Sequence, residues 1–217
     1  MLVFVKNNKN SLMAVGLGIL MGLLSSSYIL LPSPFTYFFS GFFNTASVWI
    51  LFTFWFGTRF KSKIKAFVLP VSSLVLSIVV YYLIYSSVGA APLLGVNLAT
   101  TVIGWGLISI ILGGIGGLSG RMAEFAKKAN LKVFAVIIPL IIVFTENIAN
   151  LIQIIPYLSI SYINLFPFFF SLALIVLALS TPFILFRKNK LSVYIVAISV
   201  VLAVIGVFVL NLMYSLI

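Results

Sequence analysis

Residues 51–80 read LFTFWFGTRFKSKIKAFVLPVSSLVLSIVV, two apolar runs on either side of a connector with four basic residues. An apolar helix of about 20 residues can cross the roughly 30 Å hydrocarbon core of a bilayer. The connector is too short to hold a soluble domain. The stretch therefore predicts two membrane-spanning helices joined by a positively charged turn.

The same alternation of apolar runs and short polar breaks continues along the chain. Its 217 residues are 63% hydrophobic and 7% charged, whereas soluble domains carry about 25% charged residues. Backbone groups in lipid must be hydrogen-bonded within their own segment, which favours helices, and the runs lack the alternation of barrel strands. We predict a single all-α transmembrane domain over residues 1–217, with seven spans: Leu12–Leu31, Thr36–Gly57, Ala66–Ser87, Leu98–Leu118, Val133–Gln153, Ile160–Phe186 and Leu191–Met213.

Basic residues set the predicted orientation. All 13 Lys and Arg residues precede the first span or follow spans two, four and six, and the other connectors carry no charge. The positive-inside rule then places the N-terminus in the cytoplasm and the C-terminus outside. We expect a multi-pass protein of the cell membrane whose basic clusters meet anionic headgroups at the cytoplasmic face, with no nucleic-acid partner.

The first span has a second interpretation. Lys6 and Lys9, the apolar run and the serines Ser25–Ser27 resemble a secretory signal. Cleavage would leave six spans without inverting the others. The run continues to Leu31, which is long for such a signal and favours a retained span.

The residue types that are missing exclude several kinds of chemistry. The chain has no Cys, no His and no Asp, and its only acidic residues are Glu124 and Glu146. Disulfides, haem held by His or Cys, iron–sulfur clusters and the usual zinc sites are excluded. Catalytic triads and paired carboxylates are nearly excluded as well. We therefore expect no enzyme activity, no cofactor and no metal centre.

Glycines at four-residue spacing mark two of the predicted spans. Small residues at this spacing let membrane helices approach closely. We expect close helix packing in spans one and four, and a thin wall beside a path or a hinge is the alternative. The glycines concerned are Gly18, Gly22, Gly113, Gly117 and Gly120.

Glu146 lies in the stretch VFTENIANLIQ, Val143–Gln153, in the outer half of the fifth span. A charged side chain within a span usually faces protein or water, and it often marks an ion or substrate path. Asn150 shares a helical face with Glu146, and Asn147 lies beside it. Two other interpretations stay open: Glu146 only hydrogen-bonds neighbouring helices, or its side chain reaches the outer headgroups.

Other polar residues are expected at the same level of the membrane. With Glu146 they would form a cup that opens outward and binds an ion or a small solute. Three tyrosines of the third span, Tyr81, Tyr82 and Tyr85, could close it. The residues predicted to bind the ligand are Glu146, Asn147, Asn150, Asn44 and Thr100.

Four short blocks together resemble a known family. They are NTASVWILFTFWFG (Asn44–Gly57), YY (Tyr81–Tyr82), GWGLISIILGGIGG (Gly104–Gly117) and FTEN (Phe144–Asn147). Their order is similar to that of a family of small multispanning bacterial membrane proteins of unknown function. That family has an Asn-Ser-x-x-x-Trp block, a Gly-Tyr-Tyr, a Trp followed by Gly-Pro-x-x-Gly, and a glutamate in a late span.

This chain departs from the pattern at three positions, with Thr45 for the Ser, Val80 for the Gly and Gly114 for the Pro. The resemblance implies no activity, because none is assigned to the family. It does single out four positions: Asn44, Trp49, Trp105 and Glu146.

Two functions follow from these observations. The first is a transporter or permeation protein for a small solute or cation, with Glu146 as the protonatable or cation-binding group. The alternative is a non-transporting membrane protein, such as an immunity or accessory factor or a subunit of a membrane complex. It would bind a membrane-protein partner, or a second copy of itself, through its glycine-rich helix faces.

Overall fold

Helices account for the regular structure throughout the part of the chain that is described. The computed structural model describes residues 2–29, 31–32, 36, 43–88, 98–157, 165–186 and 190–215. Over these residues it has seven α-helices and no strand, and six of the helices are long and apolar enough to cross a membrane. The all-α multi-span prediction is therefore confirmed. The helices are α1 (Leu2–Ser26), α3 (Ala46–Gly57), α4 (Lys63–Ser87), α5 (Leu98–Phe125), α6 (Ala129–Ile154), α7 (Leu165–Leu185) and α8 (Lys190–Ser215), with short 3-10 turns at Ser27–Ile29 and Ile155–Tyr157.

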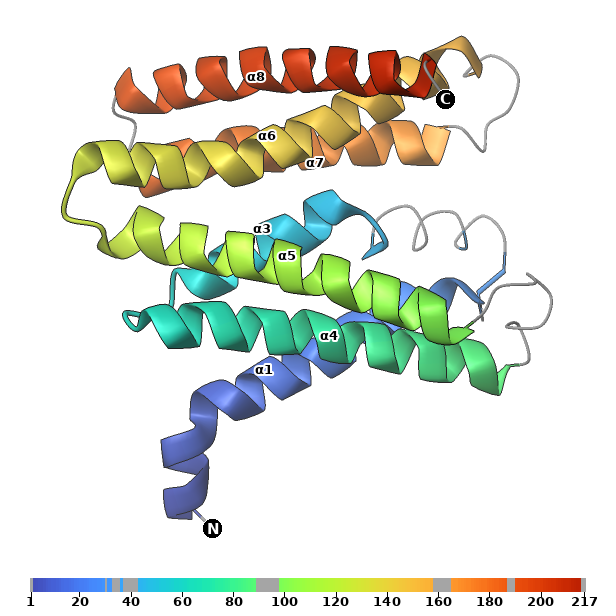
Figure 1. The fold of residues 1–217 in the computed structure, drawn as a ribbon, viewed down its shortest axis with the longest axis vertical. Helices are drawn as coiled ribbons and strands as arrows, with labels where there is room; N and C mark the ends of the chain where they lie inside the picture. Colours follow the sequence, from blue (N-terminus) through green and yellow to red (C-terminus); the bar gives the residue numbers. More distant parts are fainter. Residues whose placement is uncertain are drawn as a thin grey trace.

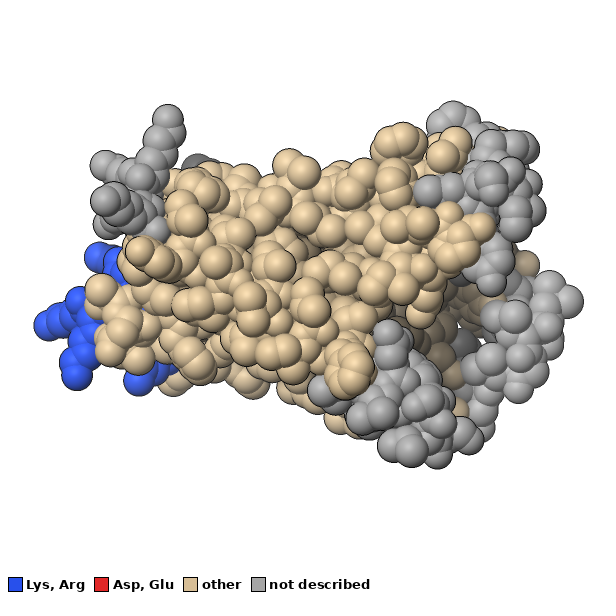
Figure 2. All heavy atoms as spheres, turned by 90° about the horizontal axis from the view of Figure 1, so that it is seen from above, with Lys and Arg blue, Asp and Glu red and all other residues tan. Residues whose placement is uncertain are grey.

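The long helices lie side by side and alternate in direction (Figure 1). The connections from α3 to α4 and from α5 to α6 lie at the same end of the bundle as the N-terminus, and the C-terminus lies at the other end. On the face that Figure 2 shows, Lys and Arg side chains gather at the end where α5 joins α6. The arrangement has the charge asymmetry on which the positive-inside rule depends.

The second predicted span, Thr36–Gly57, is wrong as one continuous helix. Thr45 has extended backbone angles, φ −100° and ψ 145°, and it is the N-cap of α3. The 12 residues of α3 extend only about 18 Å, and the helix begins part-way along the bundle (Figure 1). Threonine favours N-cap positions because its hydroxyl accepts a bond from the first turn. Because the residues on both sides of Thr45 are mostly apolar, the hydropathy of the sequence did not indicate this break.

The short helix α3 is the most enclosed part of the fold. Nine of its 12 residues are buried, including Ile50 and Phe54. They join a hydrophobic core with Leu140 and Phe144 of α6, which are also buried. Because α3 lies among α4, α5 and α6, its apolar side chains meet protein on nearly all sides.

Glycines bring the backbones of neighbouring helices into contact. A Cβ added at Gly18 would lie 2.6 Å from the carbonyl oxygen of Ser73, and one at Gly22 would lie 2.7 Å from that of Ser77. Real Cβ atoms do not approach so closely, so α1 can lie this near to α4 only because both positions lack a side chain.

The glycines of α5 make similar contacts with two helices. A Cβ at Gly120 would overlap the carbonyl oxygen of Phe54 in α3, and one at Gly117 would overlap that of Ala66 in α4. Gly113 packs against Val71 of α4. The glycines of α1 and α5 thus meet α3 and α4 rather than each other. The idea that they also bind a separate partner stays a prediction.

Candidate solute-binding site

The carboxylate of Glu146 lies at the N-terminus of α3. Its Oε1 accepts a hydrogen bond from the backbone N–H of Ala46 at 3.1 Å, and its Oε2 accepts one from the N–H of Ser47 at 2.6 Å. The hydroxyl of Ser47 also donates to Oε2. Glu146 lies about 100 residues after Ala46 and Ser47 in the sequence. It therefore links two distant segments by binding the first two N–H groups of a buried helix.

The other two N–H groups of the first turn are bonded to Thr45. Its hydroxyl accepts from Val48 N at 3.3 Å, and its carbonyl oxygen accepts from Trp49 N at 3.4 Å. The first four N–H groups of a helix have no partner within the helix. In α3 the N–H groups of Ala46 and Ser47 are satisfied by Glu146 and that of Val48 by the Thr45 hydroxyl, while Trp49 N makes the first bond within the helix.

Asn147 supports the same contact from the next position of α6. It is 1% exposed. Its amide nitrogen donates to Ser47 Oγ at 2.8 Å and to the carbonyl oxygen of Val143 at 2.8 Å. The second bond fixes the side chain to its own helix, and the first orients the Ser47 hydroxyl toward Glu146.

This geometry suits a carboxylate. A helix N-terminus carries about half a positive elementary charge, and an acidic group placed there is stabilised. All three hydrogen bonds at Glu146 are accepted from α3, as expected for an acceptor-only group. The contact fixes the end of α3 within the outer half of the bundle.

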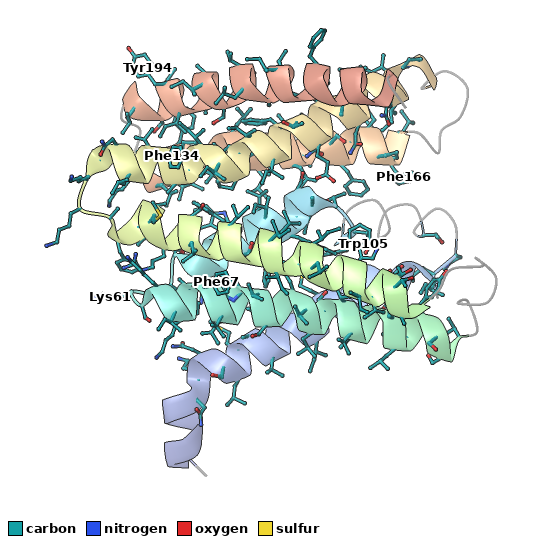
Figure 3. All side chains as sticks on the ribbon, viewed as in Figure 1. Lys61, Phe67, Trp105, Phe134, Phe166 and Tyr194 are labelled. Atoms are coloured by element: carbon teal, nitrogen blue, oxygen red, sulfur yellow. The ribbon has the colours of Figure 1, made fainter. Side chains whose placement is uncertain are left out.

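A cavity of about 100 Å³ lies on another side of the first turn of α3, between α1, α3, α4 and α5. Half of its eight lining residues are aromatic. Trp105 of α5 lies in the half of the bundle away from Lys61 (Figure 3). The lining residues are Ser25, Asn44, Trp49, Ser77, Ile78, Tyr81, Tyr82 and Trp105.

Hydrogen bonds tie the end of α1 to the beginning of α3 at this cavity. The carbonyl oxygen of Phe43 accepts from Ser25 Oγ at 3.2 Å and from Trp49 Nε1 at 2.9 Å. In return, Asn44 Nδ2 donates to the carbonyl oxygen of Ser25 at 3.2 Å. These bonds hold Trp49, which is 4% exposed, in a fixed position in the wall.

Ser77 differs from the other polar residues of the lining. It is 1% exposed, and its hydroxyl has no hydrogen-bond partner within the described part of the chain. A buried hydroxyl without a partner costs about 1–3 kcal/mol. The hydroxyl oxygen itself is buried, so a molecule in the cavity pairs with it only if the Ser77 side chain turns toward the cavity. Ser73, one turn earlier on α4, is equally buried and unpartnered but does not line the cavity.

The structure places the five residues predicted to bind a ligand in different parts of the bundle. Asn44 lines the cavity, whereas Glu146 and Asn147 contact the first turn of α3 from α6. Asn150 is half-buried and Thr100 is exposed. Neither belongs to the lining. A ligand-binding role for these residues stays a prediction.

The aromatic part of the site follows a pattern in the sequence of α4. Ser77 and Tyr81 lie four residues apart, as do Ile78 and Tyr82, so all four share one helical face. The tyrosines were expected to close a polar cup, and two of them do line the cavity. Tyr85 stacks on Tyr81 with ring centroids 5.9 Å apart, behind the lining. The sequence did not identify Ser25 or Ser77 as site residues, because serines within or at the end of apolar spans usually only support packing.

The described residues contain no group of three or more His, Cys, Asp or Glu side chains that could hold a metal ion. The arrangement can bind a small molecule through aromatic faces and a hydroxyl.

The comparisons with known proteins identify a family for the chain. A family described only as a family of unknown function, DUF6518, matches residues 5–216. The chain belongs to this family. Its membership confirms the resemblance to an uncharacterised family and covers every residue of the cavity and of the Glu146 contact. Neither the curated proteins nor the solved structures compared with the chain give a match.

Proposed function

We propose that this member of the family is a transporter or permeation protein of the cell membrane for small solutes, and that the aromatic cavity is its solute site. The observation that supports this function best is the Ser77 hydroxyl, which is buried in the wall of a cavity without a partner. Interior polar groups are nearly always hydrogen-bonded. A bound solute would supply the missing bond once the Ser77 side chain turns toward the cavity.

The break before α3 supports the same function. Secondary transporters commonly bind substrate where a discontinuous helix begins near the middle of the membrane. Here Thr45 starts the short helix α3, and two residues next to this break, Asn44 and Trp49, line the cavity. Glu146 acts in this proposal as a positioning residue that holds the end of α3, without binding the solute itself. No chemical step is involved.

Removing the Ser77 hydroxyl is expected to change solute flux. We expect purified wild-type protein in vesicles to increase the uptake of at least one of three small solutes that carry an N–H or O–H group: glycerol, glycine or trimethylammonium. The Ser77→Ala variant should lower that flux at least fivefold, because the solute loses a hydrogen bond of about 1–1.5 kcal/mol and its orientation in the cavity. Uptake of the labelled solutes measures the effect.

Ser73→Ala is the matched control. Its hydroxyl is as buried and as unpartnered as that of Ser77, but it lies outside the lining. We expect wild-type flux from this variant and equal or slightly higher thermal stability from both. Uptake no faster than in protein-free vesicles for all three solutes would contradict the function. Equal loss of flux in Ser77→Ala and Ser73→Ala would contradict the assignment of this cavity as the solute site.

A further inference from the structure

We infer that the solute of this cavity is a small organic ammonium ion, held by aromatic faces. The inference rests on the proposed function, because it names the class of molecule that the same site takes. Among the eight described lining residues, four are Trp or Tyr and none is Lys, Arg, Asp or Glu. The faces of Trp and Tyr attract cations, and methylated ammonium groups are commonly recognised in aromatic cages.

The rings are arranged in perpendicular pairs. Trp49 and Trp105 have centroids 5.8 Å apart and an interplanar angle of 73°. Tyr81 and Tyr82 have centroids 4.8 Å apart and an angle of 86°. Perpendicular rings present their faces in different directions, so a compact tetrahedral cation can contact more than one face. The two pairs come from three helices, α3, α4 and α5.

The charges of the chain favour a cation in the same place. In the sequence, every Lys and Arg lies near the N-terminus or in and beside the connectors that the predicted topology places on one side. Glu146 of α6 binds Ala46 and Ser47, which lie in the sequence between the lining residues Asn44 and Trp49. A full negative charge outweighs the half-charge of the helix end it caps. The region therefore attracts positive charge.

The chemistry of the lining residues favours an organic cation over a metal ion. Metal ions such as Ca²⁺ and Mg²⁺ need about six or more oxygen ligands, and here half of the lining residues present rings. A cavity of roughly 150 Å³ holds benzene, so the 100 Å³ found here suits a tetrahedral ion with few heavy atoms. The Ser77 hydroxyl could accept a bond from a substituent that retains an N–H or O–H group.

Tetramethylammonium and its uncharged analogue of the same shape, tert-butanol, test this inference directly. The chain has three tryptophans, and two of them, Trp49 and Trp105, line the cavity. In a Trp55→Phe background, all tryptophan fluorescence comes from the site. We expect the tryptophan fluorescence to change saturably when tetramethylammonium is added. The Kd for tetramethylammonium should be at least tenfold below the Kd for tert-butanol.

Trp105→Leu in the same background localises the binding. Its side chain is 40% exposed, so the fold should tolerate the change while the Kd for tetramethylammonium rises at least tenfold. Phe134→Leu is the control, because Phe134 is an exposed aromatic residue of α6 outside this lining (Figure 3). It should leave the Kd unchanged.

Three results would overturn the inference. They are the absence of saturable binding, equal affinity for tetramethylammonium and tert-butanol, and an unchanged Kd in Trp105→Leu. None of them overturns the proposed function, which depends on whether flux of any solute requires Ser77. Ser77-dependent flux of glycerol or glycine together with equal affinities would mean a carrier of uncharged or zwitterionic solutes.

Discussion

Gly120→Ala is expected to destabilise the folded protein by more than about 3 kcal/mol, the upper end for one methyl group inserted into a packed interior. The added Cβ would overlap the carbonyl oxygen of Phe54, a backbone atom that no rotamer change can move aside. Accommodating it requires α5 to move away from α3, which also separates Gly116 from Thr53. Unfolding midpoints in detergent and the yield of monodisperse protein measure the loss.

Gly104→Ala is the matched control on the same helix. A Cβ at Gly104 has no atom within 4 Å among the described residues. Alanine is favoured over glycine within helices by about 1 kcal/mol, so this variant should be as stable as the wild type or slightly more stable. Equal stability of Gly120→Ala and Gly104→Ala would contradict the described packing of α5 on α3.

Glu146→Gln is expected to cost about 2–4 kcal/mol of stability. Hydrogen bonds to charged groups contribute about 1.5–3 kcal/mol, and a buried donor left without an acceptor adds a further penalty. Glutamine keeps one acceptor oxygen, but its NH₂ group would face a second donor, either the N–H of Ala46 or the N–H and hydroxyl of Ser47. The attraction between a full negative charge and the helix end is also lost. Thermal unfolding in detergent measures the difference.

Glu124 provides the comparison, as the only other acidic residue of the chain. Its side chain is exposed near the end of α5, at the positively charged side of the bundle. Exposed substitutions usually change stability by no more than about 0.5 kcal/mol, and we expect Glu124→Gln to stay within that limit. A Glu146→Gln variant that is as stable as Glu124→Gln would exclude the carboxylate as the cap of α3.

The six long helices and their alternating direction could be predicted because they depend on the composition of each segment and its connectors. Long apolar runs and one-sided basic connectors are properties of single segments, and lipid imposes both. The break at Thr45 depends instead on a contact between distant segments. It is stable because Glu146, about 100 residues later, binds the exposed N–H groups of Ala46 and Ser47. Nothing near Thr45 in the sequence indicates that contact.

The site was predictable only in part for the same reason. Glu146 was identified from the sequence as an intramembrane charge, and the structure adds that it contacts Ala46 and Ser47 of α3. The partners it binds are backbone N–H groups, which every sequence contains. The cavity lining comes from α1, α3, α4 and α5. Whether Ser77 faces a cavity and Ser73 faces packed helices depends on the helix rotation that Gly18 and Gly22 set.

An experimental structure of the protein with tetramethylammonium would test the central claim most directly. That claim is that Glu146 holds the end of α3 while the solute occupies the neighbouring aromatic cavity. We predict ligand density between Trp49, Trp105, Tyr81 and Tyr82, with both oxygens of Glu146 still bound to Ala46 and Ser47. Density coordinated by the Glu146 carboxylate itself, with the first turn of α3 detached from it, would contradict the account.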